Sequence, residues 1–405
     1  MREPLPAPPA ARSAYPALAA LAVITLLQVG ISLLQQGPAA MAPLIVRDLH
    51  ISRAELGLLT SAIWGGMLLG TLPGGLLVDR YRERIVVAVG VLAMALLVLL
   101  ASFGPSFEIV FALFLASSVG AAFASPGGTR ALVAWFPRHR LGVALGVRQT
   151  GVMAGGLLGA LLLPPLALLA GWRASFRFAA VFTVLGVILF VAGYREPAGA
   201  ARRGRPLKLR SLPRNRTWIA ATLYGFVFMG ALGVGISYLA LFLHEGARLS
   251  VVAAADLLAL LQLGGLVGRL GGGLVSDRLG RRAPVMVGMG ALAVLVAFAF
   301  AFTGARTPLP VLALLSFLLG LSTLGWNALS ITVISESVPI EAAATATGAN
   351  LSIAFIAMFA ISPLFGLLAD RLGGYSVSWL ALGGWCVLGV LAGLLIRERS
   401  GVPAP

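Results

Sequence analysis

GGLVGRLGGGLVSDRLGRR, residues 264–282, is an apolar, glycine-rich stretch that ends in a cluster of basic residues. An earlier stretch, GGLLVDRYRER at residues 74–84, follows a similar pattern of glycines, apolar residues and a basic cluster. The two align at an offset of 198 residues (268 − 70). The aligned pairs are Gly70 with Gly268, Gly75 with Gly273, Asp79 with Asp277, Arg80 with Arg278, and Arg84 with Arg282. The chain therefore contains one structural landmark twice.

The composition places this landmark in a membrane protein. Of the 405 residues, 59% are hydrophobic and 11% are charged, whereas soluble domains carry about a quarter charged residues. Apolar runs of about 20 residues, long enough to cross the hydrocarbon core of a bilayer, recur along almost the whole chain. Because no water is available there, the backbone must satisfy its own hydrogen bonds, and these runs are predicted to be helices.

We predict twelve membrane-spanning helices. Their expected ranges are 15–45, 55–78, 85–104, 107–134, 141–169, 175–193, 217–243, 250–276, 284–303, 308–335, 341–368 and 376–396. A long polar segment separates the first six from the last six. A second pair of landmarks, Pro137 with Pro339 and Gly146 with Gly348, lies 202 residues apart (339 − 137). The two sets of six helices are therefore predicted to be copies of one unit.

The predicted fold is an all-α membrane protein with two pseudo-symmetric six-helix bundles. The expected segments are a tail at 1–14, a bundle at 15–193, a linker at 194–216, a bundle at 217–396 and a tail at 397–405. The net charge of +16 does not indicate nucleic-acid binding, because most Lys and Arg residues lie in the loops between spans, the linker and the tails. More of them lie on the side of the linker and both termini, and positive loops stay cytoplasmic. We therefore expect a multi-pass, monomeric protein of the inner membrane with both termini in the cytoplasm.

The duplicated landmark resembles the signature of the major facilitator superfamily, Gly-x-x-x-Asp-Arg-x-Gly-x-Arg, which follows the second helix of each half in that family. The second copy matches in full, at Gly273, Asp277, Arg278, Gly280 and Arg282. The first copy matches at Gly75, Asp79, Arg80 and Arg84, with Arg82 in place of the second glycine. The resemblance covers the whole chain and implies a transporter that works by alternating access, with its site between the halves.

In the family this signature acts as a latch that holds one access state, and the same role is expected here. The first glycine of the signature is expected to let its helix approach a neighbour closely. The aspartates can face the positive N-terminal end of a helix, and the arginines can pair with acids across the two halves.

Three arginines lie inside or near the ends of the predicted spans: Arg130, Arg148 and Arg269. A charge within the bilayer costs about 2.5–3.5 kcal/mol on insertion scales, so it tends to face a protein interior or an aqueous cavity. All 14 acidic residues fall in tails, loops or span ends. The arginines are therefore expected to lack acidic partners at their own depth, and an anionic substrate is the simplest counter-charge. A guanidinium suits this role because it binds a carboxylate through two hydrogen bonds.

Each arginine also has a structural interpretation. Arg130 could reach the membrane surface, and Arg148 or Arg269 could bind carbonyl groups or reach toward a loop. Arg269 is the strongest candidate, because it resembles the helix-8 arginine that holds the substrate carboxylate in oxalate/formate exchangers and monocarboxylate transporters. Gly265 stands where the latter have an aspartate, and helix 11 offers Asn350 where the former have a lysine. The resemblance thus implies an anion site without implying those particular substrates.

Uncharged polar residues at comparable depth could complete the site, although each is equally compatible with helix packing. They are Gln28, Gln149, Trp326, Asn327 and Asn350, with Tyr224 and Tyr238 as weaker candidates. The pairs Pro164-Pro165 and Ser362-Pro363 are expected to allow a break late in helices 5 and 11.

The main alternative is a proton-coupled drug or metabolite efflux antiporter of the same superfamily. It fits less well, because the efflux pattern on helix 4 is replaced at Ala116 and Val119 and the antiporter pattern on helix 5 has Gly156 in place of proline. An enzyme is not expected, because the three histidines lack metal-ligand spacing and Cys386 has no visible base. Neither a metal nor a cofactor is expected.

The sequence therefore predicts a secondary transporter that moves a small organic anion, with a carboxylate favoured. Arg269 and Arg148 are the residues expected to bind it. Proton symport, exchange and uniport are all compatible with the sequence, so protons are a possible coupling ion.

Overall fold

The computed structural model describes residues 14–196 and 215–398, and the regular secondary structure of this part is helical. Most of the predicted tails and linker lies outside the described residues. The helices are α1 (Ala14–Ala40), α2 (Ala42–Leu49), α3 (Arg53–Arg80), α4 (Glu83–Ala101), α5 (Phe107–Ala121), α6 (Ala124–Trp135), α7 (Arg138–Ala170), α8 (Trp172–Gly193), α9 (Arg216–Glu245), α10 (Val251–Leu279), α11 (Ala283–Ala301), α12 (Leu309–Gly325), α13 (Asn327–Ser337), α14 (Ile340–Arg371) and α15 (Ser376–Leu394). They provide twelve spans that are long and apolar enough to cross a membrane, which confirms the predicted number.

The fourth and tenth spans are each built from two helices. The fourth is α5 followed by α6, and the tenth is α12 followed by α13. Pro126, in the first turn of α6, explains the first break, because its ring clashes with the carbonyl of Ala122 four residues earlier. The expected breaks at Pro164-Pro165 and at Ser362-Pro363 were wrong, since α7 and α14 continue through them. Helices in membranes tolerate such prolines when neighbouring helices and local adjustments satisfy the freed backbone groups.

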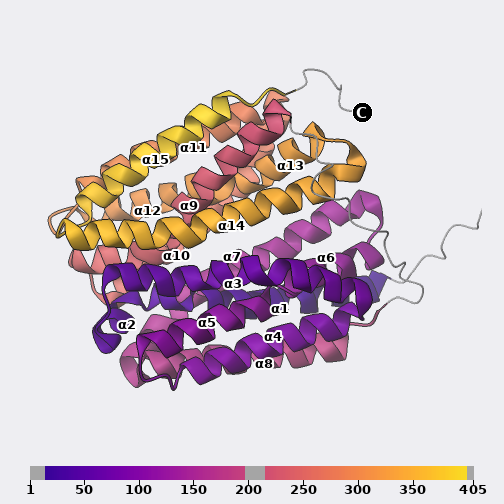
Figure 1. Ribbon diagram of the computed structural model, residues 1–405, viewed down its shortest axis with the longest axis horizontal. Helices are drawn as coiled ribbons and strands as arrows, with labels where there is room; N and C mark the ends of the chain where they lie inside the picture. Colours follow the sequence, from indigo (N-terminus) through magenta and orange to yellow (C-terminus); the bar gives the residue numbers. More distant parts are fainter. Residues whose placement is uncertain (1–13, 197–214, 399–405) are drawn as a thin grey trace, which may run out of the picture.

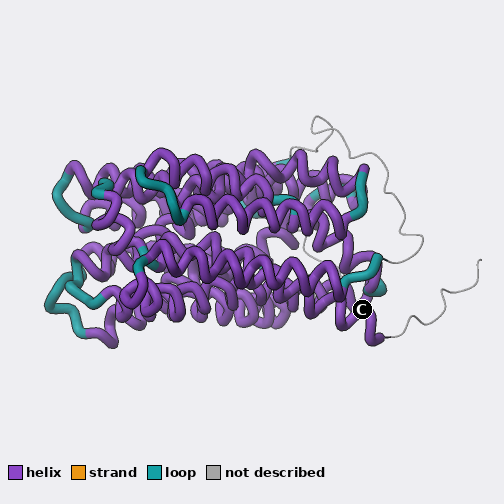
Figure 2. Tube along the Cα trace, turned by 90° about the horizontal axis from the view of Figure 1, so that it is seen from below, coloured by secondary structure: helices purple, strands orange, loops and turns teal. Residues whose placement is uncertain are grey.

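The two halves of the chain form two layers (Figure 1). Helices α1–α8, drawn from indigo to magenta, lie on one side, and α9–α15, drawn from red to yellow, lie on the other. Between the layers α3 packs along α14, and α7 packs along α10. The long helices of both layers run along one common axis (Figure 2). We call the end that holds α2 and the start of α3 the Arg53 end, and the opposite one, where α8 ends and α9 begins, the linker end.

The sequence repeat reappears in the helix packing. At two glycines of each repeat, an added Cβ would overlap a backbone carbonyl oxygen of an equivalent neighbouring helix, so the two backbones touch there. The contacts are Gly66 with Leu115, Gly70 with Val119, Gly264 with Phe317, and Gly268 with Leu321. The glycines repeat at the 198-residue offset and their partners at the 202-residue offset, so α3 with α5 and α10 with α12 are equivalent pairs.

The signature glycines do not serve the purpose expected of them. A Cβ added at Gly75 or Gly273 would meet no atom within 4 Å, so the expectation of close packing there was wrong. Gly280 ends α10 in the left-handed conformation, with φ of +62°. At the equivalent place Arg82 is extended, with φ of −67°, because a positive φ is unfavourable for a residue that carries a Cβ. The two copies of the signature therefore turn differently.

Candidate functional site

Arg269 lies on α10, ten residues before Leu279 at the end of that helix, and therefore about 15 Å along the helix from the loop that follows. Its Nε donates a hydrogen bond to the carbonyl oxygen of Leu324 at 3.2 Å, in the last turn of α12 before the break. Among the described residues, no carboxylate pairs with this guanidinium and no second protein group accepts from it. Because the side chain is half-buried and not sealed, its two terminal nitrogens are available to an anion.

Arg148 lies on α7 and is 6% exposed. Its Nη1 donates to Thr129 Oγ1 at 3.0 Å and its Nη2 donates to the Ala124 carbonyl at 3.1 Å. Longer hydrogen bonds of 3.4 Å reach the Ser125 carbonyl and Gln28 Oε1. Carbonyl and amide dipoles near the break in the fourth span therefore stabilise the charge of Arg148. In this state Arg148 binds carbonyl groups of the protein, as its structural interpretation predicts.

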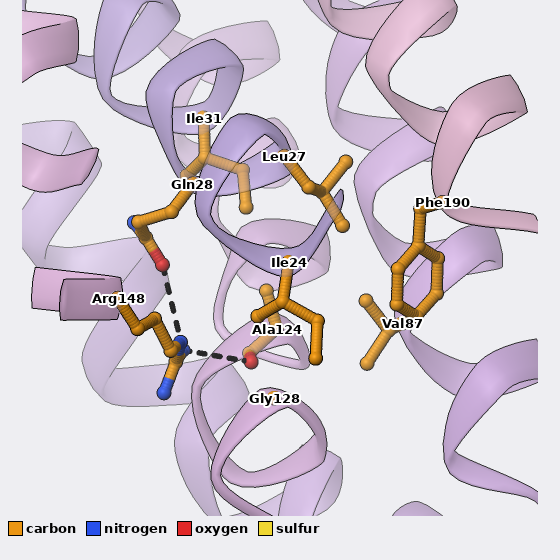
Figure 3. Close-up of a pocket in the computed structure, with 9 residues that line it drawn as sticks. All are labelled: Ile24, Leu27, Gln28, Ile31, Val87, Ala124, Gly128, Arg148 and Phe190. Carbon is orange, nitrogen blue, oxygen red and sulfur yellow. Dashed lines mark hydrogen bonds between the residues drawn. The ribbon is translucent and has the colours of Figure 1, made fainter. Parts of the chain in front are cut away.

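The pocket beside Arg148 belongs to the first half alone (Figure 3). Its lining residues come from α1, α4, α6, α7 and α8: Ile24, Leu27, Gln28, Ile31, Val87, Ala124, Gly128, Arg148 and Phe190. Gly128 leaves room for the arginine, since an added Cβ would lie 3.0 Å from the guanidinium carbon. Arg148 and Gln28 are thus brought together, but they lie against α6, whereas Arg269 lies against α12 in the other half.

Arg130 has a protein counter-charge. Its Nε lies 3.5 Å from Glu83 Oε2, and its Nη1 donates to the Val78 carbonyl at 2.5 Å. Glu83 is buried at the start of α4 and also accepts a hydrogen bond from the Tyr194 hydroxyl at 2.9 Å. The expectation that Arg130 lacks an acid at its own depth was wrong, because an acid at the end of one span reaches an arginine near the end of another. Arg130 needs no substrate to neutralise it.

The remaining polar candidates are dispersed. Asn350 and Trp326 share one place in the second half, since a Cβ at Gly225 would lie 3.3 Å from Asn350 Nδ2 and 3.6 Å from the Trp326 ring. Asn350 Nδ2 is buried without a hydrogen-bond partner among the described residues, while Trp326 Nε1 donates to the Thr323 carbonyl at 2.7 Å. Asn327 begins α13 and is half-buried.

Three further candidates occupy different surroundings. Gln149 is exposed on α7. The Tyr224 hydroxyl donates to the Met286 carbonyl at 2.6 Å inside the second half. The Tyr238 hydroxyl donates across the layers to the Arg53 carbonyl at 2.7 Å. Tyr224 therefore has a packing role, and Tyr238 takes part in a contact between the halves.

The signature arginines pair inside their own halves. Arg84 donates to the Val191 carbonyl, and Arg282 Nη1 donates to Glu336 Oε2 at 2.6 Å. Among the residues whose side chains the structure describes, no signature arginine forms the expected pair across the halves. Among the other signature residues, the guanidinium of Arg80 lies over the Tyr81 ring, and Asp277 and Arg278 are exposed; the side chain of Asp79 lies outside the described part.

Sequence reasoning missed the polar cluster that ties the two halves at the Arg53 end. Arg53 donates to Glu245 Oε2 through Nε and Nη2, at 2.9 and 2.8 Å, and through Nε to the Tyr375 hydroxyl at 3.1 Å. Its Nη1 lies 3.7 Å from Asp370 Oδ1, and Asp370 also accepts from the Ala54 backbone N–H at 2.9 Å. In the sequence these charges look like ordinary span ends. We call Arg53, Tyr238, Glu245, Asp370 and Tyr375 the Arg53 clamp.

A second contact between the halves lies deeper. Gln262 Nε2 on α10 donates to Gln36 Oε1 on α1, and Gln36 Nε2 donates to the Val152 carbonyl on α7 at 3.4 Å. Both glutamines are buried, with 2% and 7% exposure for Gln262 and Gln36. The signal in the sequence is a lone glutamine inside an apolar run, LLALLQLGG at residues 257–265. Polar contacts between described residues of the two halves therefore lie at the clamp and at this glutamine pair.

A family model, the Major Facilitator Superfamily, matches residues 23–360. The chain belongs to the Major Facilitator Superfamily. It is therefore a multi-pass membrane protein of a transporter family, in agreement with the resemblance of its duplicated signature.

Similar proteins include transporters named for anionic compounds. The "Probable sulfoacetate transporter SauU" of Cupriavidus necator is 26% identical over 404 residues, covering 90% of each chain. The "Hexuronate transporter" of Bacillus subtilis is 22% identical over 386 residues, again covering 90% of each chain. Among solved structures, a bacterial homolog of the human lysosomal transporter Spinster has a TM-score of 0.74 at 18% identity, covering 96% of this chain and 99% of its own. This last likeness concerns the fold alone.

Proposed function

We propose that this protein is a secondary transporter that moves a small organic anion, such as a carboxylate, across the membrane by alternating access. The observation that carries the proposal is Arg269, a residue about 15 Å along its helix from the loop that follows, whose guanidinium is bound to one carbonyl oxygen and to no described carboxylate. A charge at such depth is a functional candidate by default. Sulfoacetate and hexuronate, the compounds in the names of two relatives, are both anions.

The contacts between the halves support alternating access. The Arg53 clamp and the glutamine pair join the halves, whereas the signature arginines Arg84 and Arg282 at the linker end pair within their own halves. We take the linker end as cytoplasmic, in an inner membrane, because basic residues concentrate there. The structure is then an inward-facing state, in which residues 15–193 and 217–396 are the two moving units and 194–216 connects them.

A ligand screen on purified full-length protein tests the substrate class. Mono- and dicarboxylates and sulfonates are added singly, and the unfolding temperature is measured, because a ligand that binds only the folded state stabilises it more as the ratio of its concentration to its Kd rises. We expect a shift for at least one anion with the native chain and none with Arg269→Ala. Arg173→Ala is the matched control, since Arg173 pairs with Asp48 outside the site and its loss should leave the anion shift intact.

The efflux alternative predicts a different pattern. If organic cations stabilise the native protein and no anion does, the anion proposal is wrong and efflux replaces it. If anions stabilise the native chain and Arg269→Ala equally, Arg269 is not their binding residue.

A further inference from the structure

Two buried amides lie where α10 of the second half packs along α7 of the first. Gln262 and Gln36 are 2% and 7% exposed, and Gln262 Nε2 donates to Gln36 Oε1 across the halves. Gly156 of α7 leaves room for both, since an added Cβ would lie 2.6 Å from Gln36 Nε2 and 2.7 Å from Gln262 Nε2. The proline that the antiporter pattern has at this position carries a Cβ and would collide with both amides. The departure from that pattern at Gly156 therefore admits the glutamine pair.

The hydrogen bonds of this pair are incomplete. A glutamine amide can donate two hydrogen bonds and accept two. Gln262 makes one described bond, through Nε2, while its Oε1 is buried without a hydrogen-bond partner among the described residues. The described acceptor of Gln36 Nε2 is the Val152 carbonyl, at the long distance of 3.4 Å. The closed arrangement thus buries two amides and gives them one bond between the halves and one long bond within the first half.

The free-energy balance of the pair favours separation of the halves. A hydrogen bond between neutral groups contributes less to stability than a buried, unsatisfied polar atom costs, because water satisfies both groups before burial. When the halves separate, water can reach the amides and satisfy the atoms that the protein leaves unpaired. The glutamine pair therefore joins the halves in this state and at the same time makes the joined state less stable than an apolar contact would.

We propose that the glutamine pair is a destabilising element that keeps the closed Arg53 end able to open. This inference rests on the alternating access of the proposed function and not on the identity of the transported anion. The Arg53 clamp holds α3 against the second half through charged groups, while the glutamines weaken the closure beside α7 and α10. The two polar contacts between the halves act in opposite directions, so the equilibrium between access states responds to small changes in free energy.

The test replaces the amides with methionine, an apolar side chain of similar length. Cys386→Ala removes the single cysteine of the chain, and Ser61→Cys then reports the opening of the Arg53 end through its rate of reaction with a polar thiol reagent. Ser61 is fully buried on α3, which packs along α14. The rate therefore reports the opening of the whole end and not a local change beside the glutamines.

The expected rates differ in sign between the double and the single variants. Gln36→Met combined with Gln262→Met should lower the rate about fivefold, which corresponds to a closed state more stable by about 1 kcal/mol. Each single substitution should raise the rate, because it removes the bond and leaves one amide buried. Gln36→Met should raise it more, since both polar atoms of Gln262 then lack a partner, whereas Gln262→Met leaves Gln36 its bond to the Val152 carbonyl.

Gln28→Met is the matched control, because Gln28 lies on the same helix as Gln36 and contacts Arg148 within its own half; its rate should equal the native one. If the double variant raises the rate as the single variants do, the pair is a lock that closes the end and the inference is wrong. Equal rates for all glutamine variants would also overturn it. Should the double methionine variant fail to fold, the corresponding double leucine variant tests the same sign. If the thiol reacts in no variant, Arg53→Gln included, this end does not open and the proposed alternating access fails instead.

Discussion

The Arg53 clamp predicts how the equilibrium between access states responds to one substitution. Arg53→Gln removes the ion pairs of Arg53 with Glu245 and Asp370, whose side chains are 29% and 27% exposed. Hydrogen bonds to charged groups contribute about 1.5–3 kcal/mol each, and exposed ion pairs less than 1 kcal/mol. Because the clamp is partly screened by solvent, we assign about 2 kcal/mol to its contribution to the free-energy difference between the closed and open states of the Arg53 end. That energy corresponds to a shift of about 30-fold in the equilibrium, since 1.4 kcal/mol is a factor of ten.

A cysteine assay measures this shift. Cys386 is the single cysteine of the chain, so Cys386→Ala gives a cysteine-free background. Ser61→Cys then places a thiol on α3 one turn after Gly57, at a fully buried position. Gly57 itself packs against Pro363 of the other half, since a Cβ added at Gly57 would lie 2.8 Å from the Cα of Pro363. The thiol should react with a polar reagent only when the Arg53 end opens, and the reaction rate reports the open population.

We expect Arg53→Gln to raise that rate about 30-fold, in proportion to the open population. Arg173→Gln is the matched control, because Arg173 pairs with Asp48 in the same half and at the same end. Equal rates for the native and Arg53→Gln proteins would refute the clamp as the element that closes this end. The same conclusion follows if Arg173→Gln raises the rate as much.

Three further predictions concern stability. Gly128→Ala should lower the unfolding temperature in detergent, because its methyl group would lie 3.0 Å from the Arg148 guanidinium, whereas Gly146→Ala, in open space on α7, should not. The double-mutant cycle of Glu83→Gln and Arg130→Met should give a coupling free energy of about 1–3 kcal/mol, and additive effects would mean that the pair does not interact. Burial raises the pKa of Asp48, but hydrogen bonds from Trp172 and Arg173 outweigh it and leave the pKa below its ordinary value. The ionised Asp48 thus stabilises the fold above its unfolded-state pKa, and this contribution is lost as the pH falls through the lower folded-state pKa. Asp48→Asn should remove this contribution, so the unfolding temperature should fall less steeply with decreasing pH below about pH 4 than it does for the native protein.

Features that depend on one helix at a time could be predicted from the sequence. The number of spans follows from the length of apolar runs, and the depth of Arg269 follows from the helical rise and its distance from Asp277. The duplicated signature gave the family. Each of these inferences needs no knowledge of which helix lies beside which.

The partners of the charged residues could not be predicted, because they depend on which helices are neighbours. Glu83 and Arg130 are 47 residues apart in the chain (130 − 83) and lie near the ends of different predicted spans. They nevertheless form an ion pair. Arg53 and Glu245 come from different halves, and their meeting depends on how the layers pack. The depth of Arg148 was predictable, but the orientation of its side chain toward α6 was not.

The touching backbones at Gly66, Gly70, Gly264 and Gly268 limit how the fourth and tenth spans can move. With no side chain between them, α3 with α5, and α10 with α12, have no room to slide past each other. The helical breaks come directly after α5 and α12, and α6 and α13 lie beyond them on the linker side. Any bending of these two spans is therefore confined to α6 and α13, so in each half a short terminal segment can swing while the rest of its helix stays in place.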